Sequence, residues 1–168
     1  MDKKEIPFLT ATDLSKLIES KEVSPIEATE AYLDRIQEVD GSLNSYITVT
    51  GEQALESARL AEQEITTGIN RGPLHGVPIA VKDQFNTAGV LTTGGSSILK
   101  ENIPEEDATV ISKLKDAGAV LLGKLNMSEF AMAEIYQHPY GTPRNPWDLE
   151  RNPGTSSSGS GAATAAFL

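Results

Sequence analysis

Two short apolar runs constrain the fold more than any other feature of this sequence. They cover residues 77–81 and 119–122, and a glycine comes directly before each of them. Each run is too short for a helix but has the length of a buried strand. A helix-forming stretch, residues 107–117, lies between them, so the two strands can be parallel and joined by a right-handed crossover. The sequence therefore predicts an α/β architecture.

The first third of the sequence is typical of helices. Ser24 and Glu27 form a capping box around Pro25, which stands at the first helical position. We expect the helix that starts there to end before Gly41. Apolar residues at helical spacing indicate a helix on either side of it, with Leu14, Leu17 and Ile18 in the first and Ala54, Ala58, Ala61 and Ile65 in the second, between Thr50 and Gly68.

The expected fold class is α/β, with N-terminal helices followed by the start of a mixed or parallel sheet flanked by helices. A chain of 168 residues has the usual size of one domain. We interpret residues 1–70 as a helical N-terminal region and residues 71–168 as the start of an α/β core within the same domain. Residues 136–160 are rich in Pro, Gly, Asn and Ser and are expected to form a loop before a helix that starts near Ala162. That helix reaches Leu168 without a polar last turn or a glycine stop, so we expect a truncation there.

Composition excludes several kinds of site. The sequence has no cysteine, which excludes a disulfide framework, a thiolate metal site and a cysteine nucleophile. Its two histidines, His75 and His138, lack partners at metal-ligand spacing, so no metal or other cofactor is expected. A formal net charge of −10, spread along the helical stretches, argues against direct contact with nucleic acid. No stretch is apolar enough to span a bilayer or to act as a signal peptide, so we expect a cytoplasmic protein without membrane contact.

Lys82 is the first candidate for chemistry. It follows the apolar run 77–81, and a side chain that leaves the end of a buried strand enters a cleft in many α/β proteins. The alternative is a solvated surface lysine that pairs with Asp83, because most lysines at strand ends are exposed.

The second candidate is the stretch 153–163, in which glycines and serines come directly before an alanine-rich helix start. Small residues let backbone amides and hydroxyls crowd together at a helix N-terminus. A flexible linker is the alternative, since Gly and Ser dominate many linkers. A phosphate-binding loop is excluded because no Gly-Lys-Ser/Thr follows.

Together with two further motifs, these stretches resemble the amidase signature family. The resemblance rests on residues 72–83, on Gly-Lys-Leu-Asn-Met-Ser-Glu-Phe-Ala-Met at 123–132, on Asn-Pro-Trp at 145–147 and on the serine-rich loop, and it covers nearly the whole chain. It implies a Ser-cisSer-Lys triad in which Lys82 is the lysine and Ser156 the serine that precedes a cis peptide bond.

The resemblance also assigns supporting roles. Ser157 would support the loop by hydrogen bonding, and the family's nucleophilic serine and oxyanion hole would lie beyond Leu168. Four residues of the 123–132 motif would line or support the substrate cleft, with core packing as the alternative: Asn126, Met127, Phe130 and Met132.

The sequence departs from the family pattern at Thr155 and Ser158, where glycine is usual. A β-branched residue resists positive φ, so Thr155 would strain the loop if the backbone needed that conformation.

The chemistry implied for this triad makes demands on both residues. A base near neutral pH requires the pKa of Lys82 to fall from its ordinary ~10.4 to about 7, which burial at a closed strand end can achieve. Ser156, between the base and the nucleophile, would relay the proton to Lys82 and later return it to the leaving amine.

The function expected from this resemblance is hydrolysis of a small-molecule carboxamide by an amidase, through an acyl-enzyme and without metal or nucleotide. One alternative is the glutaminase A subunit of a tRNA-dependent amidotransferase, which releases ammonia for partner subunits. Residues 133–136 read Ala-Glu-Ile-Tyr where those subunits tend to have glycine and serine, which favours a general amidase. The other alternative is a non-catalytic fragment, since the isolated 168 residues are expected to lack activity.

Overall fold

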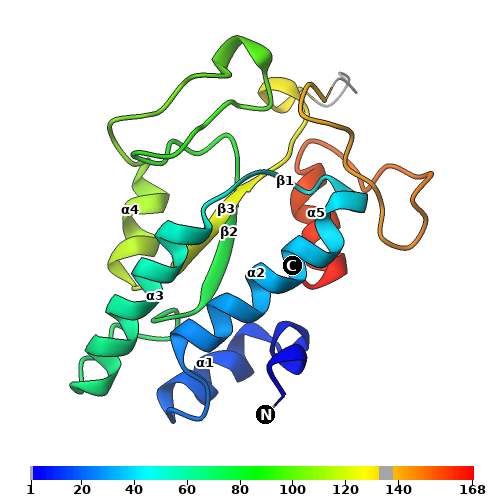
Figure 1. The fold of residues 1–168 in the computed structure, drawn as a ribbon. Helices are drawn as coiled ribbons and strands as arrows, with labels where there is room; N and C mark the ends of the chain where they lie inside the picture. Colours follow the sequence, from blue (N-terminus) through cyan, green and yellow to red (C-terminus); the bar gives the residue numbers. More distant parts are fainter. Residues whose placement is uncertain (1, 133–137) are drawn as a thin grey trace.

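The structure is a computed structural model that describes residues 2–132 and 138–168. Figure 1 shows helices packed around a small sheet, with the N-terminal helices at the opposite end from the loops that follow β2. In chain order the elements are η1 (Lys3–Phe8), α1 (Ala11–Glu19), α2 (Pro25–Leu43), β1 (Tyr46–Val49), α3 (Gly51–Thr66), β2 (Pro78–Lys82), η2 (Ser97–Leu99), α4 (Thr109–Asp116), β3 (Val120–Leu125), η3 (Glu129–Ala131) and α5 (Ser158–Ala166), where η marks a 3-10 helix.

The sheet has the order β1-β3-β2, with β3 in the middle. β2 and β3 are parallel, which confirms the predicted strand pair, and α4 lies in the connection between them. β1 is antiparallel to β3 and makes the sheet mixed. This strand was not predicted, because four residues between two helices give too short a pattern to separate from a loop.

The capping box that starts α2 is confirmed. The Glu27 amide donates to Ser24 Oγ at 3.1 Å, and the Ser24 amide donates to Glu27 Oε2 at 2.9 Å. The expected end before Gly41 is wrong, since α2 continues to Leu43 and ends where Asn44 takes the left-handed conformation, with φ 52°. One glycine inside a helix costs only about 1 kcal/mol, which the packing of a long helix offsets.

The main core lies between the sheet and helices α2, α3 and α5 (Figure 1). The alanine stripe predicted for the third helix faces it, because Ala54 and Ala58 are buried and let α3 approach β3 closely. The buried residues of this core are Ile36, Tyr46, Ala54, Ala58, Val120, Leu122, Leu125 and Ala163.

A second core joins the N-terminal helices to the start of β2. It fills the space between η1, α1 and α2, and Val77 closes it from the segment before the sheet. Its buried residues are Ile6, Leu14, Ile18, Val23, Ala28, Ala31 and Val77.

Arg35 of α2 links the first and last segments of the chain. Its Nη2 donates to the Ala166 carbonyl at 2.7 Å, and its Nε donates to the Phe167 carbonyl at 3.1 Å. The guanidinium also lies 4.6 Å from the ring centroid of Phe8, which itself lies 5.0 Å from the Phe167 ring. The last turn of α5 is therefore fixed to α2 and η1.

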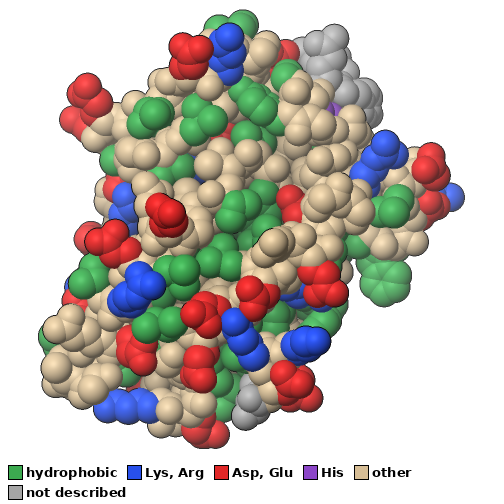
Figure 2. Space-filling model, in the orientation of Figure 1, with side chains coloured by type: hydrophobic (Ala, Val, Ile, Leu, Met, Phe, Trp, Pro, Cys, Tyr) green, Lys and Arg blue, Asp and Glu red, His purple; other side chains and the backbone are tan. Residues whose placement is uncertain are grey.

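Charged side chains of both signs are scattered over the surface. Figure 2 shows basic side chains standing singly among acidic ones on the face that it draws. The net charge of −10 is thus not gathered into one patch on this face. None of the helices in the described part of the chain has both the length and the apolarity that a membrane crossing needs.

Candidate active site

Lys82 and Ser156, separated by 74 positions, meet at the end of β2. Lys82 is the last residue of that strand, and its Nζ lies 2.7 Å from Ser156 Oγ. The alternative pairing of Lys82 with Asp83 is wrong. Strand geometry points neighbouring side chains to opposite faces, and Asp83 is fully buried against Lys124 instead.

Backbone hydrogen bonds hold the Ser156 loop against the end of β3. The Ser128 amide donates to the Ser156 carbonyl at 3.1 Å, and the Gly159 amide donates to the Asn126 carbonyl at 2.8 Å. The Asn126 amide in turn donates to the Ser45 carbonyl at 2.8 Å. Only glycine fits at position 159, because a Cβ there would lie 2.3 Å from the Ser45 carbonyl oxygen.

This packing also explains why α5 starts earlier than expected. The helix begins at Ser158 rather than near Ala162, so the end of the expected loop 136–160 is helical. Gly159 and the serines around it belong to the helix because their small side chains allow contact with β3, whereas composition alone suggests a loop.

The cis peptide bond joins Thr155 to Ser156. The expectation that Ser156 precedes such a bond is wrong by one position, because Ser156 follows it. After Ser156 the chain continues through Ser157 directly into α5. Thr155 does not have a positive φ. The neighbouring residue that has one is Gly154, with φ 102°. The strain considered for Thr155 therefore has no basis in its φ.

Ser157 is the N-cap residue of α5. Its side chain makes no capping hydrogen bond, but its carbonyl accepts from the Gly161 amide at 3.0 Å. Ser157 also lines a pocket of about 390 Å³ beside Lys82. Lys82 is the one charged residue among the described residues that line this pocket, which are Ala80, Val81, Lys82, Gln84, Phe85, Val110, Leu114, Ser157 and Ser160.

The apolar walls affect the protonation of Lys82. Burial lowers the pKa of Lys82 below its ordinary value, because desolvation disfavours the ammonium form. No carboxylate of the described residues lies within ion-pair distance of its Nζ to oppose this effect. The direction is the one that a general base requires.

The four residues expected at the substrate cleft do not line this pocket. Asn126 and Met127 are buried, and the Asn126 side chain donates to the carbonyls of Asn44 at 3.0 Å and Gly141 at 2.9 Å. These contacts support the loops around the end of β3. Phe130 and Met132 lie at the surface instead, where they are 50% and 55% exposed.

A buried ion pair behind the site was missed from the sequence. Lys124 and Asp83 are both fully buried, and Lys124 Nζ lies 3.3 Å from Asp83 Oδ1. Lys124 also donates to the Phe85 carbonyl at 2.9 Å and to Thr92 Oγ1 at 2.6 Å. A lysine within an apolar run is the signal that could have shown it, since an unpaired lysine avoids such a position.

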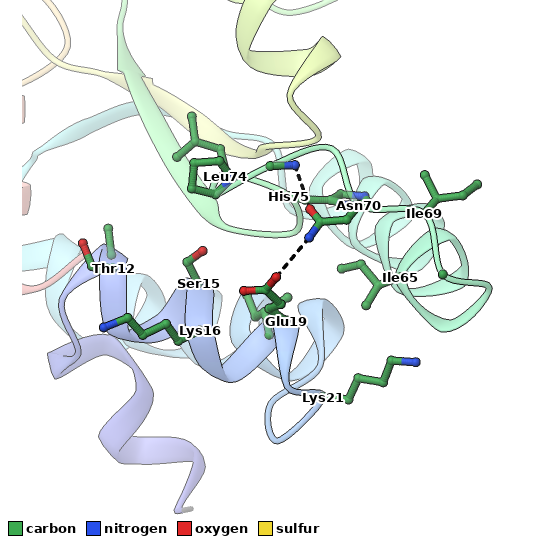
Figure 3. Close-up of a pocket in the computed structure, with 15 residues that line it drawn as sticks. Thr12, Ser15, Lys16, Glu19, Lys21, Ile65, Ile69, Asn70, Leu74 and His75 are labelled. Carbon is green, nitrogen blue, oxygen red and sulfur yellow. Dashed lines mark hydrogen bonds between the residues drawn. The ribbon is translucent and has the colours of Figure 1, made fainter.

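A larger pocket of about 660 Å³ lies away from Lys82, between α1 and residues 65–75. Figure 3 shows Lys16 and Glu19 on its α1 side, and Asn70 Nδ2 donates to Glu19 Oε1 at 3.2 Å. His75 borders it, but Nδ1 accepts from the Arg71 amide at 3.2 Å and Nε2 lies 3.0 Å from Glu64 Oε2. Nδ1 is thus occupied by a hydrogen bond, whereas Nε2 faces the Glu64 carboxylate without a hydrogen bond of regular geometry.

Comparison with known proteins places these features in a family. The sequence profile of the family described as Amidase matches residues 27–168. The A subunit of the glutamyl-tRNA(Gln) amidotransferase of Moorella thermoacetica is 53% identical over 163 residues, which are 96% of this chain and 34% of that protein. The chain spans about a third of the length of the curated relatives it matches.

Two solved structures are similar in fold. The peptide amidase of Stenotrophomonas maltophilia has a TM-score of 0.86 and 36% identity, over 91% of this chain and 33% of that one. A fatty acid amide hydrolase has a TM-score of 0.90 and 29% identity, over 99% of this chain and 30% of that one. The family match covers most of the sequence and includes both Lys82 and Ser156, so this chain belongs to the amidase family.

Proposed function

We propose that this chain supplies Lys82 and Ser156 to the catalytic centre of an enzyme that hydrolyses a carboxamide C–N bond. The contact of 2.7 Å between Lys82 Nζ and Ser156 Oγ carries the proposal, because it joins a base of lowered pKa to a hydroxyl that can pass a proton. Membership of the amidase family supports the same chemistry.

In this mechanism neutral Lys82 takes the proton of Ser156, and Ser156 takes the proton of a nucleophilic serine that lies beyond Leu168. The serine oxygen bonds to the carbonyl carbon, and the tetrahedral intermediate collapses as the C–N bond breaks. The proton returns from Lys82 through Ser156 to the leaving nitrogen. Water then attacks the acyl carbon and gives its proton through Ser156 to Lys82, and this proton passes back to the nucleophilic serine oxygen as its bond to the acyl carbon breaks. Ser157 is proposed to position the loop from the start of α5.

The substrate proposed is the side-chain amide of glutamine, with the ammonia passed to amidotransferase partner subunits in the cytoplasm. The names of the curated relatives support this choice. The pattern at residues 133–136, which favoured a general amidase, lies outside the described residues. A general amidase is the competing proposal, because the similar solved structures include a peptide amidase and a fatty acid amide hydrolase.

The domain arrangement is also a proposal. We infer that residues 1–168 form the N-terminal part of one amidase domain, with residues 1–70 as its mainly helical part and 71–168 as the start of its α/β core. The pairing of β1 with β3 supports a single domain, because β1 comes from the first part and β3 from the second.

The test is ammonia release by the full-length polypeptide that carries these residues. With glutamine as substrate, Lys82→Ala and Ser156→Ala should each lower kcat by about 10²–10⁴-fold, the usual contribution of acid–base catalysis. Lys113→Ala, at an exposed lysine of α4 that does not line the pocket, is the control and should keep wild-type turnover.

Four outcomes separate the alternatives. Turnover of simple amides but not of glutamine would assign a general amidase, and glutamine turnover that rises with added amidotransferase partners would support the glutaminase role. Wild-type turnover by Lys82→Ala would refute the catalytic assignment. Substrate binding without turnover by the full-length protein would indicate a non-catalytic binding protein.

A further inference from the structure

Lys82 and Asp83 are neighbours in sequence but take part in separate networks. The side chain of Lys82 contacts Ser156, whereas that of Asp83 is buried on the other side of the strand end. The backbone of Asp83 continues the sheet, since its amide donates to the Leu125 carbonyl at 3.0 Å. The proposed base, Lys82, therefore stands at the end of β2, and the next residue, Asp83, carries a buried carboxylate.

The contacts of the Asp83 carboxylate lie away from Lys82. Oδ2 accepts from the Thr93 amide at 2.8 Å and from Thr93 Oγ1 at 2.5 Å. Oδ1 accepts no hydrogen bond of regular geometry, but it lies 3.3 Å from Lys124 Nζ, with which it forms an ion pair. The loop after β2 is folded back around the carboxylate, because the Gly94 amide also donates to the Asp83 carbonyl at 3.3 Å.

Lys124 is placed to supply the matching charge. It stands on β3 opposite Val81, so it shares the strand end with the base, and it has no exposed surface. A buried carboxylate without a cation is strongly unfavourable, which explains why a lysine occupies this position in an apolar strand.

Resting on the function proposed above, we propose that Lys124 is a positioning residue for Lys82. By binding the Asp83 carboxylate behind the sheet, Lys124 leaves Lys82 facing Ser156 without an acidic partner. Without Lys124, an uncompensated carboxylate one residue from Lys82 would stabilise its ammonium form and remove the base.

Among the described residues that line the pocket beside Lys82, the other elements bring no competing charge. α5 has no titratable side chain between Ser158 and Ala166, and the residues Gln84 and Phe85 after β2 are uncharged. α4 contributes uncharged Val110 and Leu114 to the pocket. Its charged residues, which do not line the pocket, are Lys113, Lys115 and Asp116.

The experiment measures the protonation of Lys82 in the full-length protein without relying on turnover. Trace acetic anhydride acetylates only neutral amines, and mass spectrometry compares the peptide that contains Lys82 with the peptide that contains exposed Lys100. In Lys124→Met, acetylation of Lys82 relative to Lys100 at pH 8 should fall by roughly tenfold or more, as expected when a nearby opposite charge loses its own counter-ion. Lys113→Met removes one positive charge near the same pocket and should leave the ratio unchanged.

The double variant Lys124→Met with Asp83→Asn removes both charges and should return the ratio to the wild-type value. Wild-type labelling in a folded Lys124→Met protein would overturn the proposal. Should Lys124→Met fail to fold, the double variant decides alone: a wild-type ratio supports the proposal, and a changed ratio refutes it.

The labelling result is independent of the proposed function. A full-length protein that hydrolyses no amide would refute the amidase assignment, while the response of Lys82 to Lys124→Met would still be measured. In an active enzyme, kcat rises with pH as Lys82 loses its proton, and Lys124→Met should shift this rise to higher pH. A purely structural role of Lys124 would instead lower kcat by the same factor at every pH.

Discussion

Burial at the end of β2 gives Lys82 different proton affinities in the folded and unfolded chain. Desolvation lowers its pKa in the folded protein, whereas the unfolded chain has an ordinary value near ~10.4. Below the folded pKa both states carry the proton, and the folded state bears the desolvation cost. As pH rises from the folded to the unfolded pKa, the folded amine loses its charge first, so stability increases with pH over that interval.

This linkage predicts that Lys82→Met stabilises the fold at pH 7 and that the gain disappears near pH 10. The expected gain is less than about 1 kcal/mol, because Lys82 keeps part of its hydration. Urea unfolding at both pH values measures it, with Lys113→Met as the exposed control. A variant that is less stable than wild type at pH 7 would show that the contact with Ser156 outweighs desolvation.

At the scale of residues, sequence patterns led to Lys82 and Ser156 but not to Lys124. A lysine after an apolar strand and a serine-rich loop are both local signals in the sequence. The resemblance to a family is what assigns the two to one site. The partner of Lys124 is set by the register of β2 against β3 and by the loop that brings Thr92 and Thr93 back, which no local pattern contains. Asn126 was predicted at the cleft, but its amide contacts with the carbonyls of Asn44 and Gly141 likewise depend on the tertiary structure.

The position of α5 depends on one glycine. A Cβ at Gly159 would lie 2.3 Å from the Ser45 carbonyl oxygen and 2.5 Å from the Asn126 amide nitrogen, and backbone atoms cannot move aside as a flexible side chain can. Gly159→Ala should therefore destabilise the protein by about 2–3 kcal/mol. It should also displace Ser156 from Lys82 and lower amide turnover. Thermal unfolding and kcat measure the two effects.

Gly41 in α2 is the matched control, since it is a helical glycine with nothing within 4 Å of its added Cβ. Gly41→Ala should stabilise the protein by about 0.5–1 kcal/mol through helix propensity. A similar gain for Gly159→Ala would contradict the packing that we assign to α5.

At the scale of elements, patterns with their own local signals predicted well, and features that depend on tertiary contacts did not. The helix that begins at Ser24 carries an explicit start signal, and the two apolar runs became β2 and β3. The end of α2 and the existence of β1 depend instead on tertiary contacts. Tyr46–Val49 forms a strand because it pairs with the edge of β3.

Across the whole molecule, Arg35 joins segments that are far apart in sequence. Arg35→Met keeps the aliphatic stem but removes the hydrogen bonds to the end of α5 and the contact with Phe8. We expect a loss of about 1–2 kcal/mol in the free energy of unfolding. Arg59→Met on the exposed face of α3 is the control and should change stability little. Equal stability of the two variants in urea would exclude a structural role for Arg35.

The strand order also has a consequence for the order in which a newly made chain can fold. Within the part of the chain that the structure describes, both outer strands of the sheet pair only with β3, which is synthesised after both of them. On the ribosome the N-terminal helices can pack early, while β1 and β2 wait without a partner until Leu125 has left the exit tunnel. The site that joins Lys82 to Ser156 forms later still, so the lysine stays an ordinary solvated amine until Ser156 has been synthesised and packed against β2.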